Sequence, residues 1–268
     1  MVSKRNKRIK KILKESDKKT VIVYLILRAL VIISLVAQIF HQNWHNVFLC
    51  ILTLILFAIP FVVDKKFKIN LPTLLEIIIL LFIFSAEILG EIQNFYGIFK
   101  HWDTILHTLN GFLSAAIGLS LIDILNRSDR FHIQMTPIFV SFVAFCFSMT
   151  IGVLWEFFEF SGDQLLKMDM QKDRIVDTIS TVELNPEGKN VPIIVNNIDH
   201  TVIYYQENGE MKETTIENGY LDLGIIDTMK DLIVNFIGAV CFSVIGYLYI
   251  ENRDKYKIAE HFIPKMRT

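Results

Sequence analysis

The sequence is poor in cysteine and lacks the short motifs of familiar hydrolases. Its three cysteines, Cys50, Cys146 and Cys241, all lie in apolar runs. This placement predicts small packing residues and excludes a disulfide framework and a cysteine-type metal site. A G-x-S-x-G elbow, an H-E-x-x-H helix and an arginine-rich set of phosphatase motifs are absent. The chain also has no internal repeat, a feature that many carriers show.

Apolar residues dominate the composition. Hydrophobic residues make up 52% of the 268 residues, the formal net charge is -1 and the mean hydropathy is +0.42. These values predict an all-α polytopic membrane protein rather than a soluble domain. A spanning helix needs about twenty residues, and six runs reach that length: 20–40, 44–63, 71–89, 103–123, 136–159 and 227–250. The first run exceeds the apolar part of a cleaved signal, so we expect a retained signal-anchor helix.

Basic residues predict the orientation. Nine of the 27 Lys and Arg lie in residues 1–19, and ten more lie in the other segments that a cytoplasmic N-terminus places inside. The short outer loops contain only Lys100. The positive-inside rule therefore predicts a multi-pass protein of the plasma (inner) membrane with both termini in the cytoplasm. Beside a spanning helix, the basic N-terminus favours contact with anionic membrane lipids over nucleic acid.

A polar insertion separates the fifth and sixth spans. It carries twelve Asp and Glu against five Lys and Arg, and β-branched segments such as RIVDTISTVEL and HTVIYYQ replace the apolar runs. Asn208-Gly209 is typical of a tight hairpin turn, so we expect a small antiparallel sheet that serves as a lid, a partner-binding surface or a solvated insert. The expected organisation is a basic cytoplasmic segment at 1–19, five helices within 20–160, the extracytoplasmic insertion at 161–226, the sixth helix at 227–250 and a cytoplasmic tail at 251–268.

Four of the expected helices carry polar residues on one face near their outer ends. In the fourth, Asp103 and His107 are four residues apart and Asn110 follows one turn deeper. Ionisable residues inside a spanning helix are costly and indicate a functional site by default. The corresponding residues of the third, fifth and sixth helices are Glu87 and Glu91; Glu156, Glu159 and Asp163; and Asp227, Asp231 and Asn235. The orientation rests on Lys and Arg alone, so the shared depth of these acidic faces independently indicates one site.

The charge of this outer cluster predicts either protonated carboxyl groups or a bound cation. It contains eight carboxylates, and the nearby fixed cations are Lys100 and Lys230. Crowded carboxylates in a low-dielectric site cannot all ionise unaided, so either several hold protons or a metal neutralises them. A histidine nitrogen among oxygen ligands suits Zn²⁺, Mn²⁺ or Fe²⁺, and an oxygen-only subset suits Mg²⁺ or Ca²⁺. A structural hydrogen-bond network between helices is the alternative.

Three functions follow from these residues. In the first, a metal-dependent enzyme acts on a lipid or lipid-linked envelope precursor at the outer leaflet. The second is an ion- or proton-coupled transporter, which the scarcity of polar residues in the inner halves of the helices disfavours. The third is a non-catalytic envelope protein that binds a partner. For the enzyme, we expect His107, Glu156 and Asp231 to hold the ion, Asp103 or Asp227 to complete its shell and Glu159 to act as general base.

The order of these motifs resembles two families of bacterial membrane proteins. Asp103-x-x-x-His107, Glu156-x-x-Glu159 and Asp231-x-x-x-Asn235-x-x-Gly238 look like the motifs of the VanZ-like proteins and of the uncharacterised YjdF-type inner-membrane proteins. The likeness covers residues 87–160 and 227–250. The VanZ-like pattern usually pairs Glu with Gln in the second motif, so Glu159 favours the YjdF-type branch. The resemblance implies a cell-envelope protein, with glycopeptide tolerance known for some VanZ-like members, and it implies no particular reaction.

Overall fold

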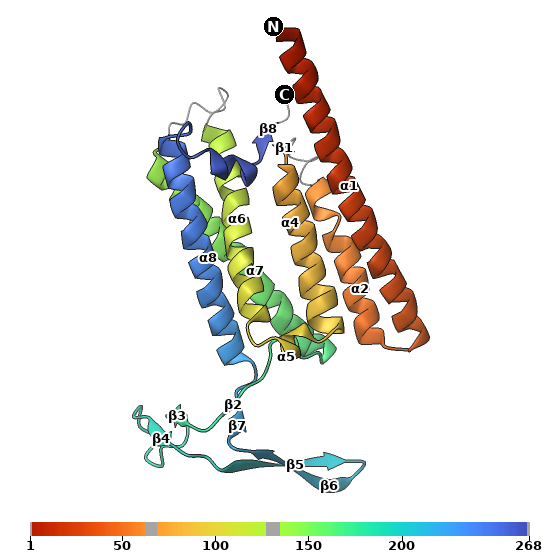
Figure 1. The fold of residues 1–268 in the computed structure, drawn as a ribbon. Helices are drawn as coiled ribbons and strands as arrows, with labels where there is room; N and C mark the ends of the chain where they lie inside the picture. The colour runs from red at the N-terminus through yellow and green to blue at the C-terminus, as the bar shows by residue number, and fades with distance from the viewer. Residues whose placement is uncertain (1, 63–68, 127–134, 267–268) are drawn as a thin grey trace. The chain divides into compact units, whose positions relative to one another are not determined.

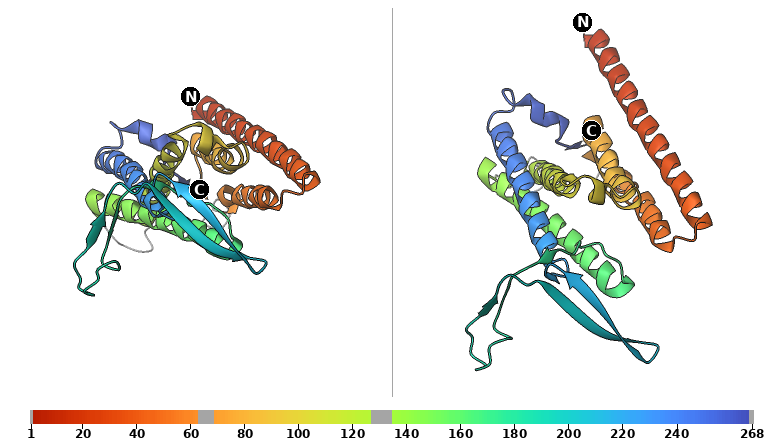
Figure 2. Two further views of the ribbon diagram at one scale, coloured as in Figure 1. Left: turned by 90° about the horizontal axis from the view of Figure 1, so that it is seen from below. Right: turned by 60° about the horizontal axis from the view of Figure 1, so that its bottom comes forward.

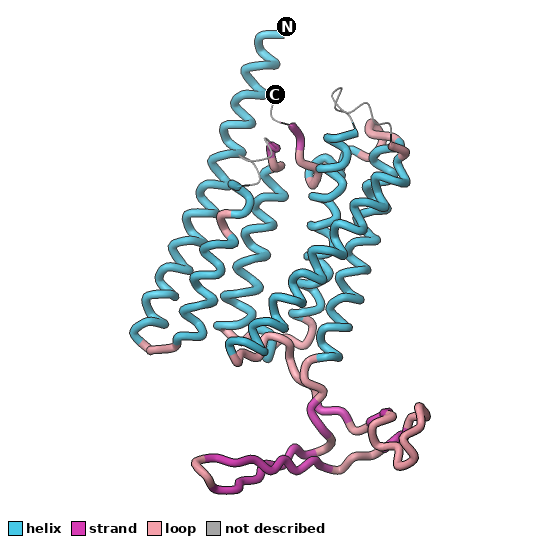
Figure 3. Tube along the Cα trace, turned by 180° about the vertical axis from the view of Figure 1, so that it is seen from behind, coloured by secondary structure: helices cyan, strands magenta, loops and turns pink. Residues whose placement is uncertain are grey.

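A computed structural model describes residues 2–62, 69–126 and 135–266. It confirms the predicted class: the chain is mostly helical, and a small region contains strands (Figures 1 and 3). Six described helices are long and apolar enough to cross a membrane, and each lies within a few residues of its predicted run, except that the fifth extends further. They are Lys18–Phe40, Trp44–Val62, Thr73–Ile92, Trp102–Asn126, Pro137–Leu166 and Ile225–Glu251.

The chain divides into two compact units. The first comprises Met1–Leu154 and Asp231–Thr268, and the second comprises Trp155–Lys230. Helices α7 (Pro137–Leu166) and α8 (Ile225–Glu251) contribute residues to both units. The other helices of the first unit are α1 (Val2–Phe40), α2 (Trp44–Leu56), α4 (Thr73–Phe84), the π-helix η1 (Ser85–Ile92), α5 (Phe95–Ile98), α6 (Trp102–Asn126) and the 3-10 helix η2 (Lys257–His261).

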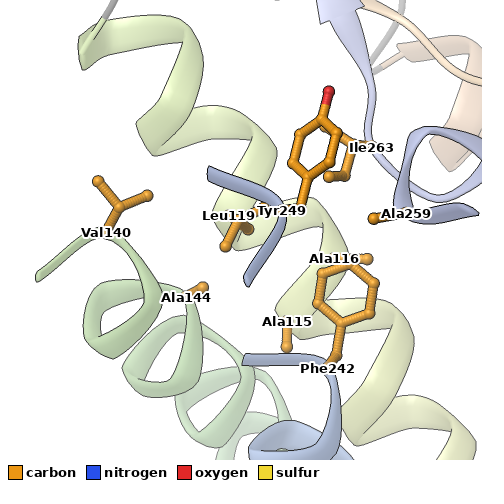
Figure 4. Close-up of a cluster of buried hydrophobic side chains, with 9 residues drawn as sticks. All are labelled: Ala115, Ala116, Leu119, Val140, Ala144, Phe242, Tyr249, Ala259 and Ile263. Atoms are coloured by element: carbon orange, nitrogen blue, oxygen red, sulfur yellow. The ribbon is translucent and has the colours of Figure 1, made fainter. Parts of the chain in front are cut away.

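Two apolar clusters hold the helices of the first unit together. One joins α1, α2, α4 and η1 around buried residues such as Val31, Cys50 and Leu80. The other joins α6, α7, α8 and the C-terminal segment around Leu119, Ala144 and other small or apolar residues (Figure 4). Figure 2 shows the corresponding grouping, with α1 and α2 apart from α6 and α8. The first unit is therefore built from two helix groups, each with its own core.

The basic N-terminal segment belongs to the first helix. Residues 2–19, predicted as a separate cytoplasmic segment, continue into the first span as one 39-residue helix. The segment contains no Gly or Pro and is rich in Lys and Arg, which favour helices. The α-helix therefore extends well beyond the residues that a membrane requires.

Two glycines allow α6 and α8 to cross closely. A Cβ atom at Gly111 of α6 would overlap the backbone carbonyl of Asn235, and a Cβ atom at Gly238 of α8 would overlap the carbonyl of Thr108. Close backbone approach through small residues is a common way to pack spanning helices. The Ser148 hydroxyl of α7 donates to the carbonyl of Gly111 at 2.7 Å, which ties the third helix to the same point.

The C-terminal segment folds back onto the helices. Its strand β8 (Lys265–Met266) pairs antiparallel with β1 (Ile69–Asn70), which precedes α4. The ring of Phe262 packs edge-on against Phe112 of α6, with 5.5 Å between ring centroids. The described part of the predicted tail thus completes the core of Figure 4.

The insertion forms three separate antiparallel strand pairs rather than one sheet. The pairs are β2 (Ile175–Val176) with β7 (Tyr220–Leu221), β3 (Ile179–Thr181) with β4 (Ile193–Val195), and β5 (His200–Glu207) with β6 (Glu210–Glu217). The predicted turn at Asn208-Gly209 is confirmed, because both residues have positive φ and join β5 to β6. The sheet prediction was wrong in extent, because turns such as that at Gly188 and the left-handed Asn197 interrupt the β-branched segments.

Candidate functional site

Asp103, His107 and Asp231 form a compact cluster between α6 and α8. The Nε2 atom of His107 lies 3.4 Å from Oδ1 of Asp103 and 3.9 Å from Oδ2 of Asp231. One potential ligand atom from each of the three residues lies within 4.8 Å of the others. Asp231 is buried, whereas Asp103 and His107 are half-buried. These three residues are the one grouping of His, Cys, Asp and Glu with metal-site spacing in the part of the chain that the structure describes.

Helix geometry places the three side chains together. Asp103 and His107 are one turn apart on the same face of α6. His107 precedes Gly111 by one turn, and Asp231 precedes Asn235 by one turn. Because Gly111 lies against the backbone of Asn235, the close crossing sets the histidine opposite the aspartate.

A layer of amides lies one turn further along both helices. The Nδ2 atom of Asn110 donates to Oδ1 of Asn235 at 3.0 Å, and the Ser114 hydroxyl donates to Oδ1 of Asn110 at 3.5 Å. The Nδ2 atom of Asn235 also lies 3.6 Å from the sulfur of Met149 in α7. The two asparagines predicted as site residues, Asn110 and Asn235, therefore bond to each other. These contacts hold α6, α7 and α8 in register one turn from the cluster.

Beyond the amide layer, α6 and α8 pack through apolar side chains. Phe112 and Phe242 meet edge-on at 4.8 Å between centroids. Ala115, Leu119 and Phe242, which Figure 4 draws in one cluster, have no exposed surface. Beyond this layer, an ion pair joins the end of α6 to the residues just after α8, with 2.6 Å between Nη2 of Arg253 and Oδ1 of Asp123. The polar cluster is therefore separated by an apolar layer from the other end of α6 and α8.

Sequence reasoning missed that ion pair. Asp123 is buried, and the guanidinium of Arg253 also lies 4.9 Å from the centre of the Tyr249 ring. In the sequence, Asp123 lies at the end of the fourth apolar run and Arg253 lies just after the sixth, and this was the pattern that could have indicated the pair. The two residues are 130 positions apart, so only the fold brings them together.

Glu87 and Glu91 lie in η1 rather than in the cluster. Glu87 is buried and Glu91 is half-buried. The π-helix packs on the start of α6, where the indole N–H of Trp102 donates to the carbonyl of Ser85 at 3.3 Å. π-Helices are rare and often occur at functional sites. The sequence located these acids on the third span but did not reveal the π-helix.

The remaining predicted residues belong to the second unit. Glu156 is buried, and Oε1 of Glu159 accepts from the indole N–H of Trp155 at 2.8 Å. Asp163 accepts from the backbone N–H groups of Met170 and Gln171 at 2.6 and 2.9 Å. Their predicted roles in catalysis and metal binding stay predictions.

Asp227 also bonds within the second unit. Its Oδ2 atom accepts from the backbone N–H of Lys172 at 3.0 Å, and its Oδ1 atom lies 3.3 Å from Nη2 of Arg174. The carboxylate is buried and near the start of α8, where the helix dipole favours negative charge. These contacts fasten the insertion to the helix, and the predicted catalytic role of Asp227 stays a prediction.

Comparison with known proteins places the chain in a family. A family model described as "Predicted membrane protein (DUF2238)" matches residues 21–182. The chain belongs to this family. The matched segment includes α6 with Asp103 and His107 and ends before α8 with Asp231. The match supports a membrane family without an assigned activity and does not single out the VanZ-like proteins.

One curated relative extends the comparison. An uncharacterized protein of Thermotoga maritima is 29% identical over 107 residues, which cover 40% of this chain and 53% of that protein. The chain thus spans about half the length of the curated relative it matches. No solved structure matches the chain.

Proposed function

We propose that this membrane protein holds a divalent transition-metal ion between α6 and α8, with Asp103, His107 and Asp231 as ligands. The observation that carries the proposal is the approach of one ligand atom from each residue to within 4.8 Å of the others. An imidazole nitrogen with two carboxylates suits Zn²⁺, Mn²⁺ or Fe²⁺. The amide layer of Asn110 and Asn235 supports the site by fixing the two helices that carry the ligands.

The bound metal would serve hydrolysis of a lipid or lipid-linked envelope substrate. Three protein ligands leave coordination positions for water and substrate, as catalytic sites do and closed structural sites do not. The ion would supply Lewis-acid chemistry: it would make water a stronger nucleophile near neutral pH and polarise the bond to be hydrolysed. The side chain of Asp103 is 23% exposed and that of His107 is 11% exposed, which supports access to the cluster from the Asp103 side.

The apolar layer below the cluster favours this function over transport. A path along α6 and α8 would need polar groups at successive depths. Between the amide layer and the Asp123–Arg253 pair, Ala115, Leu119 and Phe242 are fully buried. The buried polar side chains of α6 and α8 at these depths are the neutral hydroxyls of Ser120, which donates to the Ala116 carbonyl of its own helix, and Ser243. The geometry therefore supports a site reached from one end of the helices rather than a passage along them.

We further propose that the site lies in the outer leaflet of the plasma membrane. The excess of Lys and Arg in residues 1–19 supports a cytoplasmic N-terminus. With six spans, the start of α6 and the start of α8 then face outward. The resemblance of the motifs to VanZ-like and YjdF-type proteins supports a role in the bacterial cell envelope. Protease accessibility of the insertion on intact cells decides the orientation.

Metal content tests the proposed ligands directly. The full chain is purified in lipid nanodiscs, equilibrated separately with Zn²⁺, Mn²⁺ or Fe²⁺, dialysed and analysed for metal by mass spectrometry. We expect about one ion per chain in the wild type, and a loss of tenfold or more in apparent affinity in His107→Ala and Asp231→Asn. Substitution of Co²⁺ should give visible absorption bands that both variants lose.

Two matched controls separate ligand loss from general damage. His101→Ala removes an exposed histidine outside the cluster and should keep the metal. Asp123→Asn alters a buried aspartate on the same helix and should also keep it, even where it lowers thermal stability. A folded wild type that takes up none of the three ions, or a His107→Ala variant with unchanged affinity, contradicts the proposal. With metal loaded, hydrolysis of lipid-linked precursors tests the enzymatic role.

A further inference from the structure

Glu87 occupies a position where the third span otherwise buries apolar residues. Leu80 and Ile83 are buried on α4, and helical spacing places Glu87 next on the same face. Only 3% of the surface of Glu87 is exposed. A carboxyl group at this position adds nothing to apolar packing, so its presence calls for another role.

Glu87 differs from the other buried acids in its contacts. Within residues 2–62, 69–126 and 135–266, it takes part in no hydrogen bond and no ion pair. Asp123, which is similarly buried, pairs with Arg253. An ionised carboxylate buried without a partner is so costly that the group holds a proton instead. Burial without a partner therefore favours the neutral acid at Glu87.

The described helices that pack against the π-helix around Glu87 contain no lysine or arginine. η1 packs against α2, α4, α5 and α6. The described titratable residues of η1 and these helices, none of which bonds to Glu87, are Glu91, His45, Cys50, Glu76, Tyr96, Asp103, His107 and Asp123. Glu91 follows Glu87 by about one turn of the π-helix, and a second negative charge nearby disfavours the anion of Glu87 further.

The backbone around Glu87 is held by its neighbours. Trp102 donates to the carbonyl of Ser85, and the ring of Tyr96 lies where a Cβ atom at Gly90 would be. These contacts fix the π-helix on both sides of the acid. The carboxyl group is therefore kept at one place inside the span.

From these observations we infer that Glu87 is a proton-binding site within the third span, distinct from the cluster of Asp103, His107 and Asp231. The ligand is a proton rather than a metal ion, because the described grouping with metal-site spacing does not include Glu87. Buried acids of this kind act as proton donors or relays in membrane proteins. The site lies in η1 and does not depend on the proposed metal ion.

Dicyclohexylcarbodiimide provides the test, because this apolar reagent reacts with protonated carboxyl groups. The acid gives its proton to one carbodiimide nitrogen while its oxygen bonds to the central carbon, and the adduct rearranges to a stable N-acylurea. The wild-type protein in nanodiscs is labelled near neutral pH, digested and analysed by mass spectrometry. We expect one adduct at Glu87, none at that position in Glu87→Gln, and an unchanged adduct at Glu87 in Glu91→Gln.

Each outcome decides the inference. A folded wild type without an adduct at Glu87 overturns it, and this result does not depend on how any variant folds. Protection of Glu87 by millimolar Na⁺, K⁺ or Zn²⁺ also overturns it, because the site would then bind that cation. Glu87→Gln should keep the wild-type thermal transition, since an amide resembles a neutral acid in shape and charge. The Glu87→Gln variant should also bind as much metal as the wild type. Metal content thus tests the proposed function, and the adduct at Glu87 tests this inference separately.

Discussion

Asp222 shows how one carboxylate holds the base of the insertion. Its Oδ1 atom accepts from the backbone N–H of Arg174 at 2.6 Å, and its Oδ2 atom accepts from that of Ile226 at 2.9 Å. Burial acts to raise the pKa of Asp222, but these bonds and that from Gly224 outweigh it, so the pKa lies below its ordinary value. The stabilisation is therefore complete above the unfolded-state pKa of about 4 and is lost as pH falls through the lower folded-state pKa.

We expect Asp222→Asn to loosen this junction at neutral pH. The amide keeps one acceptor oxygen but loses the charge, and the loss of a comparable helix cap costs about 1 kcal/mol. Hydrogen exchange, corrected for intrinsic rates, should be roughly fivefold faster at the amides of Arg174 and Ile226. The difference from the wild type should vanish in strong acid. The control is Asp177→Asn. The Asp177 carboxylate is exposed and, in its described contacts, accepts only from the neighbouring Thr178 hydroxyl. Equal protection at neutral pH would contradict this role.

Spacing along the helices predicted part of the cluster at the level of single residues. The four-residue step from Asp103 to His107 and the depth of Asp231 follow from a 3.6-residue period and a correct count of spans. Spacing could not reveal that Asp163 and Asp227 bond to backbone N–H groups of residues 170–172. The helical period predicts the face of the helix on which a side chain lies. It does not predict which backbone N–H groups of a neighbouring loop bond to that side chain, because loops have no such period.

At the scale of elements, the crossing of α6 and α8 determines whether the cluster exists. In Gly238→Ala, the new methyl group would overlap the backbone carbonyl of Thr108, so α8 must move away from α6. Overpacking of this kind costs about 1–3 kcal/mol. We expect a lower thermal transition, and weaker metal binding because His107 and Asp231 separate. Metal analysis and thermal unfolding in nanodiscs measure both effects.

The same helix supplies the control for this substitution. A Cβ atom at Gly246 would meet the side-chain methyl groups of Leu119, which can rotate aside, rather than a backbone atom. Gly246→Ala should therefore change metal affinity little. Equal affinity and stability in the two variants would show that the close crossing does not position the ligands.

Two elements could not be predicted from apolar periodicity. The π-helix at Ser85–Ile92 is accompanied by tertiary contacts of Trp102 and Tyr96, and the sequence FSAEILGEI reads equally well as an ordinary helix. The C-terminal residues lack a long apolar run, yet Phe262 and Ile263 join the core through partners on α6 and α8. In both cases, contacts between residues distant in sequence stabilise the local structure.

At the scale of the whole molecule, opposite charges are segregated along the chain. The first helix begins with nine Lys and Arg among nineteen residues, whereas the insertion carries a twofold excess of acids. A membrane potential and the cytoplasmic retention of basic segments both favour one orientation for such a chain. The orientation decides which leaflet the cluster of Asp103, His107 and Asp231 faces.

Trypsin provides a test with cleavage sites already in the chain. In the insertion, the side chains of Lys189 and Lys212 are 68% and 45% exposed. On intact spheroplasts, trypsin should cut at these lysines and spare residues 1–19, and on inverted vesicles it should do the reverse. Lys189→Gln with Lys212→Gln should remove these two outer cuts without affecting the inner ones. Cleavage within residues 1–19 on spheroplasts would instead place the cluster at the cytoplasmic leaflet, where a substrate carried on the outer leaflet could not reach it.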